Sequence, residues 1–167
     1  EVKRYIELAK DLDAGRVRVF GNDMPAGVPR DDVIQYVGES LTELGEFAEQ
    51  FDIEVNLEMH GQFNRWRFTK RAVEIADHPL VGIVYNCDPR DVIGGSIAAT
   101  IDHVLPYLQH VHMHELIDPK FPYHEFIPLL AKLEYTGYLS AEIEANADPN
   151  RVLGYYSTLF RAYLNQA

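Results

Sequence analysis

The stretch Ile53–Gly61, which reads Ile-Glu-Val-Asn-Leu-Glu-Met-His-Gly, decides how the rest of the chain is interpreted. Apolar and polar side chains alternate along it, which is typical of a strand with one buried face. Glu58 and His60 share the polar face at the carboxyl end, where a carboxylate and an imidazole offer a place for a metal ion or a proton transfer. Further strand-like stretches downstream end in the same way, so an ordinary edge strand is the weaker interpretation.

The composition of the chain indicates a globular protein, and its charge opposes some classes of binding partner. The chain has 167 residues, of which 47% are hydrophobic and 25% charged, so we expect one domain over residues 1–167. Its formal net charge of -11 opposes broad binding to nucleic acid. No apolar run approaches the roughly 20 residues that cross a membrane. The lone cysteine, Cys87, indicates a reducing, cytoplasmic compartment. The oligomeric state stays open, a homo-oligomer included.

Strand-like and helix-like segments alternate along the chain. A helical pattern opens it, and five strand-like runs follow, each with a helical stretch behind it. We expect strands at 16–20, 53–61, 81–85, 110–114 and 138–144. We expect helices at 2–12, 30–51, 66–76, 94–108, 126–133 and 149–167. Strands that alternate with helices in this way favour a parallel α/β sheet.

The spacing of the polar strand ends narrows the fold class. Glu58, Asn86, His112 and Glu142 follow one another at intervals of 28, 26 and 30 residues. A TIM barrel of about 250 residues uses about 31 residues for each strand–helix unit. The sequence therefore predicts a partial (β/α)8 TIM barrel of parallel strands alternating with helices, in which about three N-terminal βα units are missing. An open, doubly wound sheet is the competing architecture, although residues 20–23 lack its glycine-rich phosphate turn.

The polar strand ends form a candidate metal site. In a barrel the carboxyl ends of the strands converge on one mouth, so Glu58, Asn86 or Asp88, His112 and Glu142 are expected to point toward a common centre. Two carboxylates, an imidazole and an amide or third carboxylate make an oxygen-rich ligand set. Such a set suits Mn²⁺, Mg²⁺ or Co²⁺ with open water positions better than Zn²⁺ held by thiolates.

Four motifs in succession resemble one known family. They are Leu57–Gly61, Val81–Asn86, Val111–Glu115 and Gly137–Glu142, and their order and intervals are similar to those of the xylose isomerase-like TIM-barrel superfamily. That group includes sugar and sugar-phosphate isomerases and epimerases, inosose and dehydroshikimate dehydratases, and endonuclease IV-type repair enzymes. The resemblance covers nearly the whole chain from Arg16 onward and implies its C-terminal five βα units.

The resemblance implies a set of metal ligands. Glu58, His112 and Glu142 match three of the family's ligand positions, and the strand that ends at Asn86 supplies the fourth. The family usually has Asp there, and a neutral amide is a weaker ligand than a carboxylate. Asp88, two residues further on, is the candidate substitute. The basic residue that ketose epimerases of this group carry shortly after the histidine motif has no clear counterpart in residues 116–119.

The implied chemistry is proton abstraction next to a carbonyl. A divalent cation that binds a substrate carbonyl and the adjacent hydroxyl acidifies the C–H bond between them. Carboxylates on either face of that carbon can then remove and return the proton, and Glu58 and Glu142 are the candidate catalytic pair. The residues assigned to substrate binding are His60 for a hydroxyl, and Asn22, Arg18 and Arg90 for a polar or phosphorylated end.

Three functions remain open from the sequence. The first is a divalent-metal-dependent isomerase or epimerase of a small ketose or polyol. The second is a lyase on the same scaffold, similar to an inosose or dehydroshikimate dehydratase, which begins with the same proton abstraction. The third is a non-catalytic binding protein that retains the barrel, which the amide of Asn86 keeps open. A repair nuclease ranks below these, because the acidity of the chain opposes DNA binding.

Overall fold

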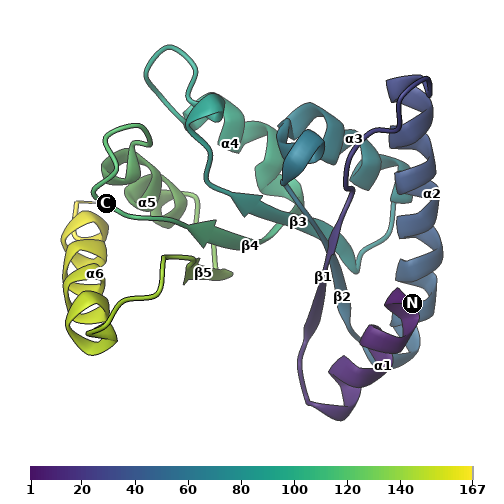
Figure 1. Cartoon of the computed structure of the whole chain (residues 1–167), viewed down its shortest axis with the longest axis horizontal. Helices are drawn as coiled ribbons and strands as arrows, with labels where there is room; N and C mark the ends of the chain where they lie inside the picture. Colours follow the sequence, from purple (N-terminus) through teal and green to yellow (C-terminus); the bar gives the residue numbers. More distant parts are fainter. Residues whose placement is uncertain (167) are drawn as a thin grey trace.

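A computed structural model describes residues 1–166 and contains five parallel strands that alternate with helices. The strands form one sheet in the order β1-β2-β3-β4-β5, so each pairs with its neighbour along the chain (Figure 1). The strand bounds are Arg16–Phe20 for β1, Glu54–Glu58 for β2, Val81–Asn86 for β3, Leu108–Met113 for β4 and Tyr138–Ala141 for β5. Within residues 1–166 this order has no reversal, which rules out a doubly wound sheet and confirms the partial TIM-barrel fold.

Helices connect the strands and lead from each one to the next. The α-helices span Val2–Asp11 (α1), Arg30–Ala48 (α2), Trp66–Ala76 (α3), Ala98–Val104 (α4), Tyr123–Lys132 (α5) and Pro149–Leu164 (α6). Short 3-10 helices span Glu49–Phe51 (η1), Gly61–Asn64 (η2), Pro89–Asp91 (η3) and Leu105–Tyr107 (η4). Residue 167, the last of the helix predicted over 149–167, lies outside the described residues. Among residues 1–166, no helix has the length and apolar character required to span a bilayer.

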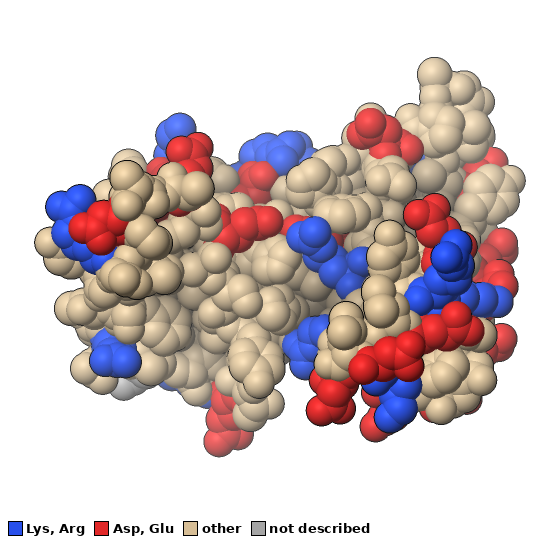
Figure 2. Space-filling model, turned by 60° about the horizontal axis from the view of Figure 1, so that its bottom comes forward, with Lys and Arg blue, Asp and Glu red and all other residues tan. Residues whose placement is uncertain are grey.

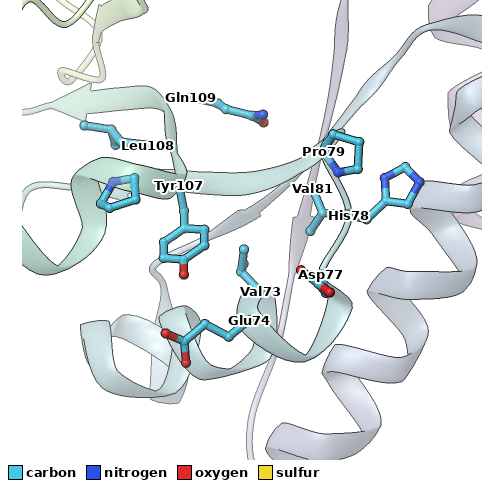
Figure 3. Close-up of a pocket in the computed structure, with 10 residues that line it drawn as sticks. Val73, Glu74, Asp77, His78, Pro79, Val81, Tyr107, Leu108 and Gln109 are labelled. Atoms are coloured by element: carbon cyan, nitrogen blue, oxygen red, sulfur yellow. The ribbon is translucent and has the colours of Figure 1, made fainter.

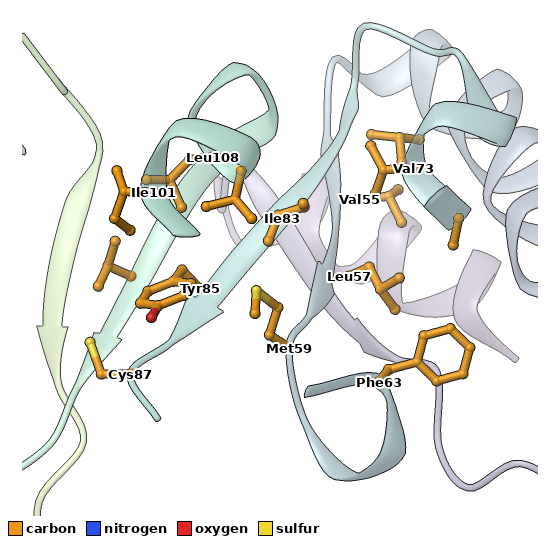
Figure 4. Close-up of a cluster of buried hydrophobic side chains, with 14 of the residues drawn as sticks. Val55, Leu57, Met59, Phe63, Val73, Ile83, Tyr85, Cys87, Ile101 and Leu108 are labelled. Carbon is orange, nitrogen blue, oxygen red and sulfur yellow. The ribbon is translucent and has the colours of Figure 1, made fainter. Parts of the chain in front are cut away.

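The core lies between the sheet and the helices that cover it (Figure 4). Val55, Leu57 and Met59, the apolar residues of the alternating stretch, are all 0% exposed. They pack in the same cluster as Ile83 from β3 and Val73 from α3. Full burial of such a side chain contributes about 1.5–3 kcal/mol. The alternation along β2 is therefore explained by a buried apolar face, which leaves the other face free for polar side chains.

The helix predicted over 94–108 is wrong at both ends. It begins only at Ala98, because Gly94 and Gly95 adopt φ angles of 61° and 89°, in the left-handed region that ends a regular helix. These two glycines form a turn closed by hydrogen bonds between Ile93 and Ser96. At the other end, residue 108 is already the first residue of β4.

The last strand–helix unit is packed less deeply than the others. Neither β5 nor α6 contains a fully buried residue. β5 also ends at Ala141, whereas the sequence predicts a strand as far as residue 144. Among the described strands β5 pairs only with β4, so one of its edges forms no ladder. A shorter and more exposed strand is the expected result.

Charged side chains of both signs are interspersed on the molecular surface. Figure 2 shows acidic and basic groups alternating over one face, without a continuous basic stripe on that face. A nucleic-acid interface would need Lys and Arg clustered along one surface. The distribution of charge on this face, like the formal net charge of -11, opposes broad binding to nucleic acid.

Candidate functional site

Three of the predicted ligands meet at the carboxyl ends of the strands. Glu58 ends β2, His112 lies in β4, and Glu142 directly follows β5. One ligand atom from each lies within 4.8 Å of the other two. His112 Nδ1 is 3.1 Å from Glu58 Oε1 and 3.5 Å from Glu142 Oε2. Side chains that are separated by 84 residues of sequence are thus neighbours in space.

The register of the sheet explains this convergence. His112 pairs with Asn86 on β3 and with Ser140 on β5. Because side chains alternate along a strand, Glu142 falls on the same face as Ser140, one step nearer the carboxyl edge. The Glu142 N–H donates to the Met113 carbonyl at 2.7 Å, which continues the ladder just beyond β5. The backbone therefore carries Glu142 to the same edge as Glu58.

The donor set and its spacing fit a divalent cation. Two carboxylates and one imidazole supply hard oxygen and nitrogen ligands without a thiolate. Neighbouring ligands of an octahedral ion with bonds of about 2.1 Å lie about 3 Å apart. The distances of 3.1 and 3.5 Å from His112 to the two carboxylates are close to that spacing. Within residues 1–166 this is the one group of His, Cys, Asp and Glu side chains found close enough to hold an ion.

Glu58 is the most buried of the three, with only 1% of the residue exposed. Its Oε1 accepts a hydrogen bond from Asn86 Nδ2 at 2.9 Å, and Arg18 Nη1 lies 2.8 Å from its Oε2. Burial by itself raises the pKa of this carboxyl, but the hydrogen bond to His112 and the charge of Arg18 outweigh burial and hold the pKa below its usual value. Glu58 is therefore ionised at neutral pH, as a metal ligand must be.

The amide of Asn86 donates to Glu58 and does not offer its oxygen to the cluster. Nδ2 points at Glu58, while Oδ1 lies 2.7 Å from His114 Nε2. His114 also reaches the other side of the site, because its Nδ1 is 3.1 Å from the backbone oxygen of Glu142. Asn86 is at the strand end where the sequence places it, and its contacts there are those of a hydrogen-bond donor to Glu58.

Asp88, the candidate substitute for Asn86, lies outside the cluster of ligand atoms. Arg90 binds it in a bidentate pair, with Nε 2.9 Å from Oδ1 and Nη2 2.7 Å from Oδ2. Asn64 Nδ2 donates a further hydrogen bond to Oδ2 at 2.9 Å. The hydrogen bond from Arg90, opposed by partial burial, lowers the pKa of the Asp88 carboxyl. Both oxygens are thus occupied by partners from the cleft wall.

A cleft of about 480 Å³ opens beside the three-residue cluster. Its lining includes three of the four residues that the sequence assigns to substrate binding, Arg18, His60 and Arg90. The His60 ring is held edge-on against Phe20, with centroids 5.2 Å apart. Asn64 also lines the cleft. The sequence offered no signal for Asn64, because it lies in the irregular turn η2 and follows no strand directly.

Asn22 is not brought to the cleft. It lies in a separate depression beside α2, together with Tyr36. The loop after β1 turns away at this point, where Asn22 adopts a φ of 58° in the left-handed region. Asn tolerates that conformation better than most residues. The turn after β1 therefore accommodates Asn22, which lies apart from the other predicted substrate contacts.

A second cavity, of about 410 Å³, lies at the opposite, amino end of the strands (Figure 3). Two of its polar lining residues are paired with residues outside the cavity. Glu74 lies near Lys70 and Arg71, and His78 contacts Glu49. Among the residues described, no cluster of ligand atoms comparable to the one at the carboxyl end is found here. The side chains that could bind a metal ion are therefore concentrated at the carboxyl end of the sheet, where TIM-barrel enzymes have their active sites.

Comparison with solved structures identifies the same fold in sugar epimerases. A 3-keto-D-glucoside 4-epimerase from E. coli has a TM-score of 0.77 at 18% identity, with 96% of this chain and 69% of that chain covered. A D-psicose 3-epimerase solved with D-fructose has a TM-score of 0.71 at 18% identity, with 84% and 54% covered. A xylose isomerase-like TIM barrel protein from Mycobacterium smegmatis, in complex with magnesium, has a TM-score of 0.67 at 20% identity, with 97% and 66% covered.

The chain spans only part of these structures, 54% to 69% of their lengths. No curated protein matches the sequence. The model of the xylose isomerase-like TIM barrel family, in contrast, matches residues 1–156. This match covers the whole of the described sheet and includes Glu58, His112 and Glu142. The chain therefore belongs to the xylose isomerase-like TIM barrel family.

Proposed function

We propose that this protein is a divalent-metal-dependent isomerase or epimerase that acts on a small ketose or polyol. The observation that supports the proposal most is the meeting of Glu58, His112 and Glu142 within 4.8 Å, at the edge of a cleft. The names of the structural relatives add support, since two act on sugars as epimerases and a third was solved with magnesium. Mn²⁺, Mg²⁺ and Co²⁺ suit this oxygen-rich set better than Zn²⁺.

In this proposal Glu58, His112 and Glu142 hold the cation, which polarises the substrate carbonyl when it is bound. Glu58 and Glu142 are also the acid–base pair. They come from β2 and β5, on either side of β4, and both are close to the His112 ring. One carboxylate removes the proton next to the carbonyl and the other returns a proton to the product. His60, at the cleft wall, contacts a substrate hydroxyl.

The proposal is tested by deuterium exchange at the carbon next to the carbonyl. The protein, loaded with Mn²⁺, is incubated with D-fructose and with D-psicose in D₂O, and the sugars are followed by NMR. We expect exchange in the natural protein and a loss of roughly 100-fold or more in Glu58→Gln and in Glu142→Gln. Glu144→Gln is the matched control, because Glu144 is exposed and lies two residues beyond Glu142; it should exchange at the natural rate.

Two outcomes would contradict the proposal. Exchange that persists in Glu142→Gln would remove this residue from the acid–base pair. A melting temperature that Mn²⁺ leaves unchanged would contradict the metal site, since a ligand at about 100 times its Kd should add about 2.7 kcal/mol of stability. Exchange accompanied by loss of water from an inosose would assign the chain to the dehydratases on this scaffold.

A further inference from the structure

The two arginines that line the cleft are each paired with a carboxylate. Arg90 forms the bidentate pair with Asp88 at 2.9 and 2.7 Å. Arg18 Nη1 lies 2.8 Å from Glu58 Oε2. Of the residues in 1–166 that line the cleft, these two have guanidinium or ammonium side chains. The charge of each guanidinium is therefore compensated by a neighbouring carboxylate, which weakens its attraction for an anionic group of a substrate.

The turns that follow the last three strands also place carboxylates where anions usually bind. Phosphate groups in barrels are commonly held by backbone N–H groups at helix N-termini after the strands. Here Asp88 accepts from the Arg90 N–H at 2.7 Å after β3, and Asp148 accepts from the Arg151 N–H at 3.2 Å after β5. After β4, the first turn of α5 contains Glu125. Each of these N-termini thus carries its own negative group.

The cleft wall instead offers hydrogen-bond acceptors. The carboxylate of Glu142 lines the cleft and its side chain is 48% exposed, so its oxygens can accept from a substrate hydroxyl. Asn64 also lines the cleft, but its Nδ2 is used by Asp88 and its Oδ1 is buried. A phosphate dianion, in contrast, has only acceptor oxygens to present. Among the lining groups outside the three-residue cluster, the Asp88 carboxylate compensates the charge of the Arg90 guanidinium.

We propose that the cleft recognises an uncharged sugar or polyol through its hydroxyl groups and excludes phosphorylated substrates. This inference rests on the proposed function, since it specifies the class of substrate for the same site. The Asp88–Arg90 pair is the specificity device. The pair has no net charge, and its carboxylate would repel an anionic group that approaches Arg90.

The pairing is tested with inorganic phosphate in the presence of EDTA, so that only protein groups can bind the anion. We expect no saturable binding to the natural protein by titration calorimetry at roughly 1 mM. Asp88→Asn removes the charge that neutralises Arg90 and should bind phosphate at least roughly tenfold more tightly. The matched control, Asp102→Asn, removes the same charge from an exposed site on α4 and should behave as the natural protein. Tight binding to the natural protein, or no gain in Asp88→Asn, would overturn the proposal.

A second measurement keeps the proposal testable if Asp88→Asn fails to fold. The natural protein, loaded with Mn²⁺, is melted with D-fructose and with D-fructose 6-phosphate as a matched pair of probes. A larger rise in melting temperature with D-fructose supports the inference, and an equal or larger rise with the phosphate ester overturns it. Deuterium exchange is scored separately. A protein that exchanges but prefers the ester refutes only this inference, whereas one that excludes phosphate without exchanging refutes only the proposed function.

Discussion

Strands β2 and β5 each bring a glutamate to the site, but their surroundings differ. Along β2, residues 55–58 are all buried, and Glu58 is 1% exposed. β5 has no buried residue, and the Glu142 side chain is 48% exposed. Glu58 is held through its carboxylate by several partners, whereas Glu142 is held mainly through its backbone. One carboxylate of the pair is therefore fixed by the core, and the other depends on a few hydrogen bonds at the edge of the sheet.

The position of each strand accounts for the contrast. β2 pairs with β1 on one side and β3 on the other, and helices α2 and α3 cover it. β5 pairs with β4 alone among the described strands. Burial and pairing on both sides restrict a strand more than pairing on one side. Burial and backbone pairing at this site therefore decrease from β2 toward β5, and three predictions follow from the contrast.

The largest expected effect is on the core beneath β2. Leu57→Ala removes a side chain that is 0% exposed and should lower the free energy of unfolding by about 2–5 kcal/mol. The matched change on the β5 side is Leu153→Ala in α6, where Leu153 is 50% exposed, and it should cost less than about 1 kcal/mol. Urea unfolding of the two variants measures both values. Equal losses would contradict the contrast.

The next effect concerns Asp91, which is 3% exposed in the turn after β3. Burial, with the charge of Asp88 adding to it and a hydrogen bond from Tyr85 opposing it, raises the pKa of the Asp91 carboxyl to about 6. The folded state then binds a proton more tightly than the unfolded state, so stability from this group is present below pH 4 and is lost as pH rises through 6.

Asp91→Asn should therefore raise stability at pH 8, relative to its effect at pH 4, by roughly 1–3 kcal/mol. The reason is that the neutral amide avoids the cost of a buried charge while it can still accept from Tyr85. Thermal unfolding at both pH values measures the difference, and Asp102→Asn on the exposed face of α4 is the control. A gain of the same size at both pH values would show that ionisation of Asp91 is not its source.

The smallest effect is expected at His114, which contacts the backbone oxygen of Glu142 at 3.1 Å. If Glu142 and the metal are related as proposed, His114→Ala should weaken Mn²⁺ binding by roughly fivefold, the value of one hydrogen bond of about 1 kcal/mol. In a Glu142→Gln background the same change should have little further effect, because the two changes act through one ligand. If His114→Ala weakened Mn²⁺ binding fivefold in that background as well, His114 would act through its contact with Asn86 instead.

The regular features of the fold were predictable because they repeat. Alternation along residues 53–61 predicted the buried face of β2. The interval of one strand–helix unit between the polar strand ends predicted that Glu58, His112 and Glu142 lie at the same edge of the sheet. Parallel strands end at a common edge, so equal spacing in sequence becomes proximity in space. The start of α4 was not predictable from apolar spacing alone, because two left-handed glycines override that pattern.

The remaining features of the site depend on partners that sequence spacing does not identify. Asn86 and Asp88 both follow β3, and either could serve as a ligand on position alone. The contact of Asn86 with His114 and the bidentate pairing of Asp88 with Arg90 decide their orientation. Such hydrogen bonds follow from side-chain rotamers and loop geometry, which leave no periodic signal in the chain.

The amide at Asn86 has a consequence for the electrostatic field of the site. A carboxylate at that strand end would leave a ligand set with a bound divalent cation negatively charged. With the amide, Glu58 and Glu142 would supply two negative charges to balance a divalent cation held as proposed, and His112 would add none as a neutral ligand. The net charge of such a centre would then depend on Arg18, the cation that lies 2.8 Å from Glu58 Oε2.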